Sequence, residues 1–278
     1  MKQVFKLFPW VFVLFMIVFA SGTLCASELE AFTGEKGVLR IAGGTAHIPV
    51  MKEAAKRIME MNSDIQITIA GGGSGAGIRQ VGEGLVDIGN SGRKPTDEEV
   101  SKYNLSMYKW AIDGVGTVVH PANPVKALSG QQLKAIYAGK ILSWKELGGQ
   151  DRPINIYTRD NSSGTREVFW EKALGKGDIS EKASFVASNG AMKAAVTNDP
   201  YAIGYVSVGY MDETVAPIAL DGVIPTLKTV QSGEYKVARA LFSNTKGEYS
   251  GLAKKLITYL LSPEGQKIVS EMGFIPVN

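Results

Sequence analysis

The sequence predicts an α/β fold with a mostly parallel sheet. Short apolar runs alternate with amphipathic segments along most of the 278 residues, as the strands and covering helices of such folds do. Two glycine-rich turns, at residues 43–44 and 71–77, each stand between a strand-like run and a helix-like segment. Ligands of open α/β sheets bind outside the carboxyl ends of the strands, so both turns are candidate binding loops.

The first 120 residues predict strand and helix pairs followed by a crossing strand. Strands are indicated by apolar blocks or by alternation, and we expect them at residues 38–42, 65–69, 86–89 and 115–120. Helices are indicated by apolar residues every three or four positions, and we expect them at 50–59, at 78–85 and after the capping-box pair Thr96 and Glu99. Pro121 and Pro124 then break the chain, and we place a domain crossing there.

The remaining residues continue the alternation. A second capping box, Ser129 and Gln132, begins a short helix, and Gly139 follows it at a position suited to left-handed geometry. We expect further strands at 154–157 and 202–206, and helices at 189–196, at 252–261 and from Pro263, which suits the first helical position.

Residues 1–26 have the pattern of a secretory signal. Lys2 and Lys6 precede an apolar run at 7–20, which is short for a membrane span, and small residues follow it. We therefore predict an exported, periplasmic protein that is cleaved after Ala26. Lipidation of Cys25 is the alternative.

The composition excludes several kinds of site. Cys25 is the single cysteine, so a disulfide or a cysteine-based metal site within one chain is excluded. Beyond residue 26 there are two histidines, His47 and His120, which makes a histidine metal cluster unlikely to form. The formal net charge is +3 with both signs interspersed, unlike the basic face of a nucleic-acid binder. We expect no metal, no cofactor and no nucleic-acid partner.

The most informative segment is Arg-Asp-Asn-Ser-Ser-Gly-Thr-Arg at residues 159–166, where a strand-like run ends and a helix-like segment begins. The first N–H groups of a helix lack intrahelical acceptors and attract anions. Arg159 adds a guanidinium that suits an oxyanion. Hydroxyl donors also stand at three expected helix starts, at Thr45, Ser74, Ser163 and Thr165. Together these residues predict an oxyanion receptor, although each hydroxyl alone is an ordinary helix cap.

The glycine-rich segment 71–77 fits other sites less well. It matches G-x-G-x-x-A of a dinucleotide fingerprint, but it follows the second strand and lacks the later acidic residue. It also nearly spells a nucleophile elbow around Ser74, with alanine in place of the last glycine. A hydrolase would need a histidine base, for which His120 is a candidate.

Seven motifs in this order resemble the periplasmic phosphate-binding proteins that feed ABC phosphate importers. They are Gly-Gly-Thr-Ala at 43–46, Gly-Gly-Gly-Ser-Gly at 71–75, Val-Asp-Ile-Gly at 86–89, Gly-Lys-Ile-x-x-Trp at 139–144, Arg-x-x-x-Ser-Gly-Thr at 159–165, Ala-Ile-Gly-Tyr-Val at 202–206 and Gly-Phe-Ile-Pro at 273–276. The resemblance implies a two-lobed type II periplasmic-binding-protein fold, each lobe a mostly parallel sheet flanked by helices, joined by crossing hinge strands. Lobe 1 would comprise residues 27–119 and 206–278, and lobe 2 residues 120–205.

The resemblance also implies a set of phosphate contacts. They carry over to Thr45, Ala46, Ser74, Arg159, Ser163, Gly164 and Thr165, with Gly75, Gly92, Arg93 and Asp113 as further candidates. Well-studied members of the family place an aspartate, which accepts the proton of hydrogen phosphate, where this chain has Gly92, whereas shorter members often have serine or glycine followed by arginine, as at 91–93 here. Our hypothesis is that Asp113 replaces that acceptor.

The expected function is a monomeric, non-enzymatic receptor that captures inorganic phosphate and delivers it to the permease subunits of an ABC importer. The alternatives are a receptor for another oxyanion, a phosphate-sensing receptor, and a serine hydrolase that uses Ser74.

Overall fold

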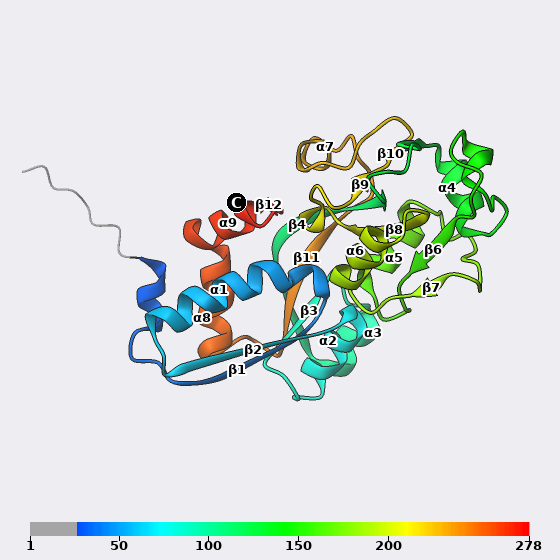
Figure 1. Ribbon diagram of the computed structural model, residues 1–278. Coiled ribbons are helices and arrows are strands. Elements are labelled where there is room, and N and C mark those ends of the chain that lie inside the picture. Colours follow the sequence, from blue (N-terminus) through cyan, green and yellow to red (C-terminus); the bar gives the residue numbers. More distant parts are fainter. Residues whose placement is uncertain (1–26, 278) are drawn as a thin grey trace, which may run out of the picture.

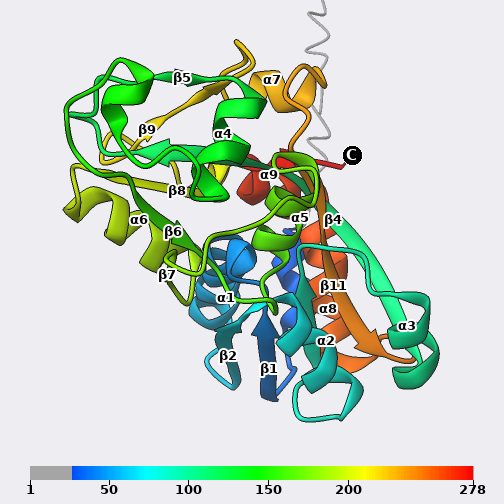
Figure 2. The same cartoon turned by 90° about the vertical axis from the view of Figure 1, so that its right-hand side faces the viewer.

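The computed structural model describes residues 27–277, so the expected signal segment lies outside the described residues. Figures 1 and 2 show two lobes joined by a pair of long strands. One curled sheet runs through both lobes in the order β2-β1-β3-β11-β4-β8-β6-β7. Within each lobe the neighbouring strands are mostly parallel, and the joining strands β4 and β11 are antiparallel to each other. The predicted two-lobed α/β fold is confirmed.

Lobe 1 carries the first parallel strands and five helices among the described residues. The strands are β1 (Gly37–Gly43), β2 (Ile65–Gly72) and β3 (Ile88–Ser91), and the short β12 (Ile275–Pro276) pairs with β4. The helices are α1 (Ile48–Met61), α2 (Gly73–Gly82), α3 (Asp97–Tyr103), α8 (Gly251–Leu261) and α9 (Pro263–Glu271), with 3-10 turns η1 (Glu28–Phe32) and η2 (Thr45–His47). Buried residues of α1, α8 and α9 form one core with β1 and β2.

Lobe 2 has its own core. Its strands are β5 (Ala127–Leu128), β6 (Asn155–Thr158), β7 (Ser184–Phe185), β8 (Ala202–Ser207), β9 (Ala216–Pro217) and β10 (Ala219–Leu220). Its helices are α4 (Gly130–Tyr137), α5 (Gly164–Lys172), α6 (Asn189–Asn198) and α7 (Leu227–Gln231), with 3-10 turns η3 (Trp144–Leu147) and η4 (Val208–Tyr210).

The boundary between the lobes differs from the expected one at residues 206–237. We expected this segment in lobe 1, but its apolar side chains, such as Ile218, Tyr235 and Val237, are buried in the same core as α4, α5 and α6. The reason lies in β9 and β10, which pair with β4 and β5 and hold the segment against lobe 2. The chain therefore returns to lobe 1 through β11 rather than directly after β8.

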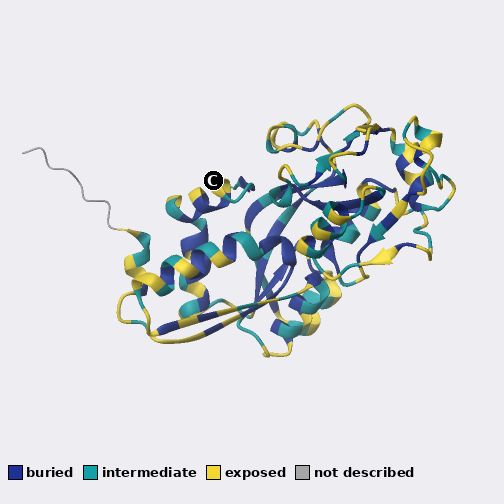
Figure 3. Cartoon of the chain, viewed as in Figure 1, coloured by how far each residue is buried: buried dark blue, intermediate teal, exposed yellow. Residues whose placement is uncertain are grey.

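The crossing strands are β4 (Leu105–Val119) and β11 (Ala238–Lys246). The expected strand at 115–120 is the last third of β4. The rest of β4 escaped the prediction because residues 105–110 mix polar and apolar side chains in a partly exposed stretch. Both strands have buried residues near the centre of the molecule (Figure 3). They pass directly beneath the place where the two lobes meet.

Local signals in the sequence mark several helix ends correctly. Thr96 and Ser129 each form the predicted capping box with the residue three positions later. Gly139 has a φ of 70°, and Pro263 stands at the start of α9, as predicted. The glycine-rich segment after β2 is itself the first turn of α2. Among residues 27–277, no helix is both long enough and apolar enough to cross a membrane.

Direct contacts hold the lobes together. Ser162 of lobe 2 donates from its hydroxyl to the Gly72 carbonyl (3.0 Å) and accepts at its own carbonyl from the Gly75 N–H (3.0 Å). Arg93 of lobe 1 forms an ion pair with Glu167 of α5 (3.0 Å). These contacts describe a closed clamp.

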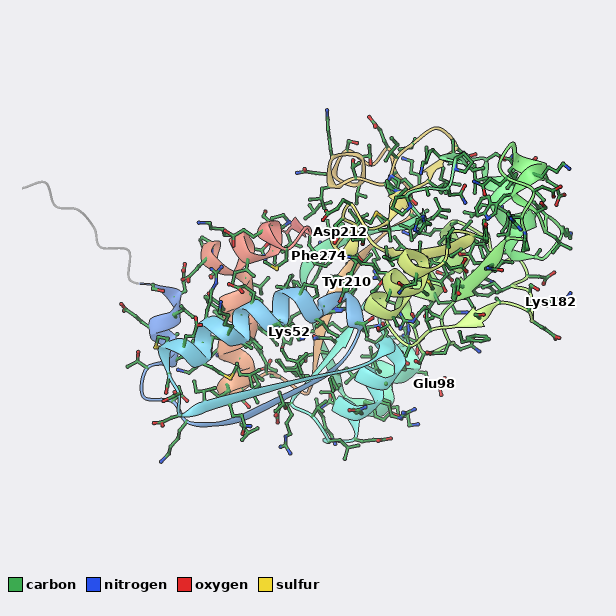
Figure 4. The ribbon with its side chains drawn as sticks, viewed as in Figure 1. Lys52, Glu98, Lys182, Tyr210, Asp212 and Phe274 are labelled. Atoms are coloured by element: carbon green, nitrogen blue, oxygen red, sulfur yellow. The ribbon has the colours of Figure 1, made fainter. Side chains whose placement is uncertain are left out.

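A further closing contact comes from Tyr210. Its hydroxyl donates to the Thr45 carbonyl at 2.6 Å, and Figure 4 shows the side chain between lobe 2 and the start of α1.

Candidate anion-binding site between the lobes

A small cavity lies at the junction of the lobes. Its atom-free volume is about 180 Å³, and both lobes and a crossing strand contribute to its wall. The lining residues come from η2, the start of α2, the loop after β3, the β6–α5 connection and β11: Gly44, Thr45, Ala46, His47, Gly73, Ser74, Gly92, Arg159, Ser163, Gly164, Thr165 and Arg239. Larger hollows lie elsewhere on the surface, but they do not gather this density of buried donors.

Two threonine hydroxyls of the cavity wall already accept hydrogen bonds. Thr45 Oγ1 accepts from the backbone N–H of Asn189 at 3.2 Å and from its side-chain Nδ2 at 3.1 Å. Thr165 Oγ1 accepts from Arg239 Nη2 at 3.0 Å and from Asn189 Nδ2 at 3.4 Å. A hydroxyl has two lone pairs and one proton. Both threonines therefore have their acceptor capacity in use and their proton left to donate.

Two serine hydroxyls of the cavity wall also accept hydrogen bonds, each with one of its two lone pairs. Ser74 Oγ accepts from the Gly92 N–H at 2.9 Å, and Ser163 Oγ caps α5 by accepting from the Arg166 N–H at 3.2 Å. Within residues 27–277, none of the four hydroxyls donates its proton to another protein group. The wall is thus arranged to donate hydrogen bonds.

The start of α5 adds backbone donors. Ser163 is the N-cap, and its side chain satisfies the third helical N–H. The N–H groups of Gly164 and Thr165 precede it and have no acceptor within the helix. Both residues line the cavity, so the positive end of the helix dipole faces it.

Arg159 is a buried guanidinium whose position in the cavity wall is fixed by a hydrogen bond. It is 1% exposed, and its Nη2 donates to the Ala187 carbonyl at 2.9 Å. Its Nε and Nη1 are buried and have no hydrogen-bond partner in the described part of the chain. Burial lowers the pKa of this guanidinium. An oxyanion would satisfy both donors and supply the missing counter-charge.

Arg239 is a functional candidate that the sequence did not reveal. It lies on β11 directly opposite Asp113 of β4. Its Nε and Nη2 donate to Asp113 Oδ2 at 2.9 and 2.8 Å. Asp113 Oδ1 accepts from the Ser207 hydroxyl at 2.6 Å. The signal that could have found Arg239 is an arginine within the apolar first half of the strand, between Ala238 and Ala240, since buried arginines are rare unless they are paired.

His47 lines the cavity as an uncharged group. Its Nδ1 donates to the Gly44 carbonyl at 3.1 Å. Burial lowers the pKa of His47 to about 3, and the charge of Arg239 contributes a smaller part of this shift. Hydrogen bonds to the backbone of Gly44, Ser91 and Phe242 act in the opposite direction but are outweighed. The ring also packs edge-on against Trp110. At neutral pH it adds no charge to the site.

The structure gathers most of the residues that the sequence nominated. All seven principal candidates line the cavity, together with Gly92: Thr45, Ala46, Ser74, Arg159, Ser163, Gly164 and Thr165. Three weaker candidates lie outside its wall. Gly75 bonds to Ser162, and Arg93 pairs with Glu99 and Glu167. Asp113 stands behind Arg239 with both oxygens engaged, so the structure gives it the task of holding Arg239 rather than that of accepting a ligand proton.

The hydrolase alternative finds little support in this geometry. Ser74 makes no hydrogen bond to a histidine among the described residues, and its recorded partner is the Gly92 N–H. His120 instead accepts at Nδ1 from the Ala122 N–H in the loop after β4. Within residues 27–277 there is no group of three or more His, Cys, Asp or Glu side chains that could hold a metal ion.

Comparisons with known proteins agree with this site. A family model described as a PBP superfamily domain matches residues 30–264. The phosphate-binding protein PstS of Bacillus subtilis is 40% identical over 257 residues, which cover 90% of this chain and 85% of that protein.

Two solved structures are similar over the same region. One is a phosphate ABC transporter substrate-binding protein from Clostridium perfringens, with bound phosphate (36% identity, TM-score 0.81, covering 87% of this chain and 100% of that one). The other is an ABC-type phosphate transport receptor from Vibrio cholerae (31% identity, TM-score 0.69, covering 86% and 100%).

Proposed function

Because the chain belongs to the PBP superfamily, in the family that includes PstS of Bacillus subtilis, we propose that it captures inorganic phosphate between its lobes. It delivers the anion to the permease subunits of an ABC importer. The protein is a binding protein and not an enzyme. The names of its relatives support the ligand and the transport system.

The observation that carries this proposal is the one-sided chemistry of the cavity. Arg159 presents two buried donors without partners, and four neighbouring hydroxyls have their protons left to donate. A buried donor without an acceptor costs about 1–3 kcal/mol. A dehydrated tetrahedral oxyanion is the kind of ligand that satisfies all these groups at once.

Binding and closure are linked in this proposal because both lobes hold the anion. Thr45 and Ser74 belong to lobe 1, whereas Arg159, Ser163 and Thr165 belong to lobe 2. A ligand that contacts both lobes binds the closed form more tightly than the open form, and so shifts the population toward it. The closed form is the one that the permease would recognise.

The cellular setting follows from the family and the N-terminal sequence. We propose that residues 1–26 direct export to the periplasm, where a monomeric protein meets the permease. Lipid attachment at Cys25 remains the alternative mode of retention.

Titration calorimetry with phosphate tests the function directly. We expect a single site that binds phosphate after the protein has been unfolded, stripped of ligand and refolded. Arsenate and molybdate, added in parallel, measure whether another oxyanion binds better. Labelling of Ser74 by a fluorophosphonate, with no phosphate binding, would instead favour the hydrolase.

Gly164 offers a test of closure that removes none of the donor groups. A Cβ at this position would lie 2.2 Å from Ser74 Oγ, so Gly164→Ala forces the lobes apart. Overpacking of this kind costs about 1–3 kcal/mol, and we expect phosphate affinity to fall roughly 5- to 150-fold.

The control for this variant is Gly190→Ala near the start of α6, where a Cβ meets nothing closer than 3.8 Å. Alanine is more favourable than glycine within a helix, and without phosphate the lobes of Gly164→Ala can separate and relieve the clash. Neither variant should therefore lower the melting temperature of the phosphate-free protein. Equal phosphate affinity in the two variants would contradict the proposed contact between the lobes.

A further inference from the structure

We propose that Arg239 is a second guanidinium contact for the bound anion and that Asp113 positions it, so that the anion lies between two arginines. This inference rests on the proposed phosphate function.

Arg239 is held with one edge turned away from its ion pair. Nε and Nη2 both bond to Asp113 Oδ2, and Nη2 also donates to Thr165. Among the described residues, Nη1 takes part in none of these bonds. Because Arg239 lines the cavity and Asp113 does not, Nη1 is the donor left for a ligand. Guanidinium groups bind oxyanions through such fixed, planar donors.

The backbone of Gly92 shows where Arg239 Nη1 lies within the site. A Cβ built on Gly92 would lie 2.6 Å from Arg239 Nη1 and 3.0 Å from its Cζ. The guanidinium therefore fills the space that a side chain at position 92 would otherwise occupy. A cationic group thus stands at this corner of the cavity wall.

The charges around the cavity are consistent with Arg239 as a second cationic contact for the anion. No carboxylate is among the residues that line it. Asp113 offsets one positive charge from behind, which leaves Arg159 as a cation without a carboxylate partner. His47 is neutral, and burial raises the pKa of Tyr205 and Tyr210 to about 12. Burial raises the pKa of Asp113, but the charge of Arg239 and the bonds from Arg239 and Ser207 oppose that rise. Because this ion pair keeps Asp113 ionised, the ligand is the group expected to change its charge between pH 6 and pH 8.

The position of Arg239 also ties the anion to the hinge. Asp113 and Arg239 stand opposite each other on the two crossing strands, and Ser207 ends the strand beside them. Through Thr165, Arg239 also contacts the first turn of α5 in lobe 2. An anion on Nη1 would therefore touch lobe 1, lobe 2 and the hinge together.

The decisive variant removes both charges of the pair. Arg239→Met with Asp113→Asn leaves neither member of this pair as a buried, unpaired charge, so the fold should survive. Loss of one charge-assisted hydrogen bond should raise the phosphate Kd by about 10- to 150-fold. Arg57→Met with Glu53→Gln, which removes a half-buried ion pair on α1, is the matched control and should leave the Kd unchanged.

The pH dependence of the phosphate Kd distinguishes direct contact between Arg239 and the anion from a purely structural role of Arg239. Between pH 6 and pH 8 phosphate becomes the dianion, and we expect the wild type to bind it more tightly over this range. The double variant should show a smaller gain because it lacks the cation that lines the cavity, whereas the carboxylate that it also lacks lies behind the cavity wall. A phosphate Kd within threefold of the wild type, or an equal loss at both pH values, would overturn the inference.

Two further results complete the test. Arg239→Lys keeps the charge but cannot bond to Asp113 in the same way, and we expect an intermediate Kd. If the double variant does not fold, full wild-type affinity in Arg239→Lys overturns the inference on its own. If the wild type binds no phosphate after its ligand has been removed, the proposed function itself is wrong, whatever the role of Arg239.

Discussion

Replacing Arg159 by methionine should abolish high-affinity phosphate binding. The variant loses two buried charge-assisted donors, Nε and Nη1, which have no protein partner in residues 27–277. Hydrogen bonds to charged groups contribute about 1.5–3 kcal/mol each, so we expect the affinity to fall roughly 10²- to 10⁴-fold. Calorimetry measures this change. Arg152→Met, at an exposed arginine outside the cavity, should bind phosphate like the wild type.

The same variant should close more readily without phosphate. In the wild type, closure buries a guanidinium whose donors lack partners, which opposes the closed form when no anion is present. Methionine removes that penalty while keeping a side chain of similar length. Small-angle scattering of the phosphate-free proteins should give a smaller radius of gyration for Arg159→Met than for the wild type. An identical radius, together with unchanged phosphate affinity, would contradict the role of Arg159.

The parts of the site that the sequence predicted are local ones. Ser163, Gly164 and Thr165 belong to one helix start, and the capping preference of serine and the unpaired first N–H groups follow from the sequence itself. Thr45 and Ser74 were found for the same reason, since each follows a strand and stands in the first turn of a helix, η2 for Thr45 and α2 for Ser74. Such features need no knowledge of distant contacts.

The parts that escaped prediction depend on distant contacts. Arg239 is 126 residues from Asp113 and 74 from Thr165 along the chain, and no local motif joins them. Asn189 orients Thr45 and Thr165 from the start of α6, yet in the sequence it looks like an ordinary residue near a helix cap. The family resemblance implied that Gly92 lacks an acceptor side chain, but neither it nor the sequence could show that Arg239 fills the space beside Gly92.

The predicted lobe boundary differs from that of the structure for a related reason. The segment after β8 has short strands of two residues each, β9 and β10, which give no periodic signal. Its place in lobe 2 is decided by pairing with β4 and β5 and by the burial of Ile218 and Tyr235. Short paired segments of this kind become visible only when the whole sheet is assembled.

Gly92→Asp should convert the site into one that rejects sulfate. In the wild type the acceptors for the proton of hydrogen phosphate are neutral, since Ser74 and Ser163 each have one lone pair in use and one left. A hydroxyl can turn to donate to an anion without a proton, so the wild type should bind sulfate within about 100-fold of phosphate. An aspartate cannot turn in this way. It should raise the sulfate Kd by about 30- to 1000-fold, because two like charges would face each other without water.

Gly92→Ala is the control that separates charge from space. Either side chain must displace the Arg239 guanidinium, which lies 2.6 Å from the new Cβ, so both variants should lose some phosphate affinity. The aspartate alone should change the ratio of the sulfate Kd to the phosphate Kd, measured by competition at pH 7. If the wild type already excludes sulfate, a charged or fixed acceptor must face the cavity, and the buried Nε2 of His47 becomes the first atom to test. If the alanine and aspartate variants give the same ratio, selectivity depends on where Arg239 stands rather than on the sign of the charge at position 92.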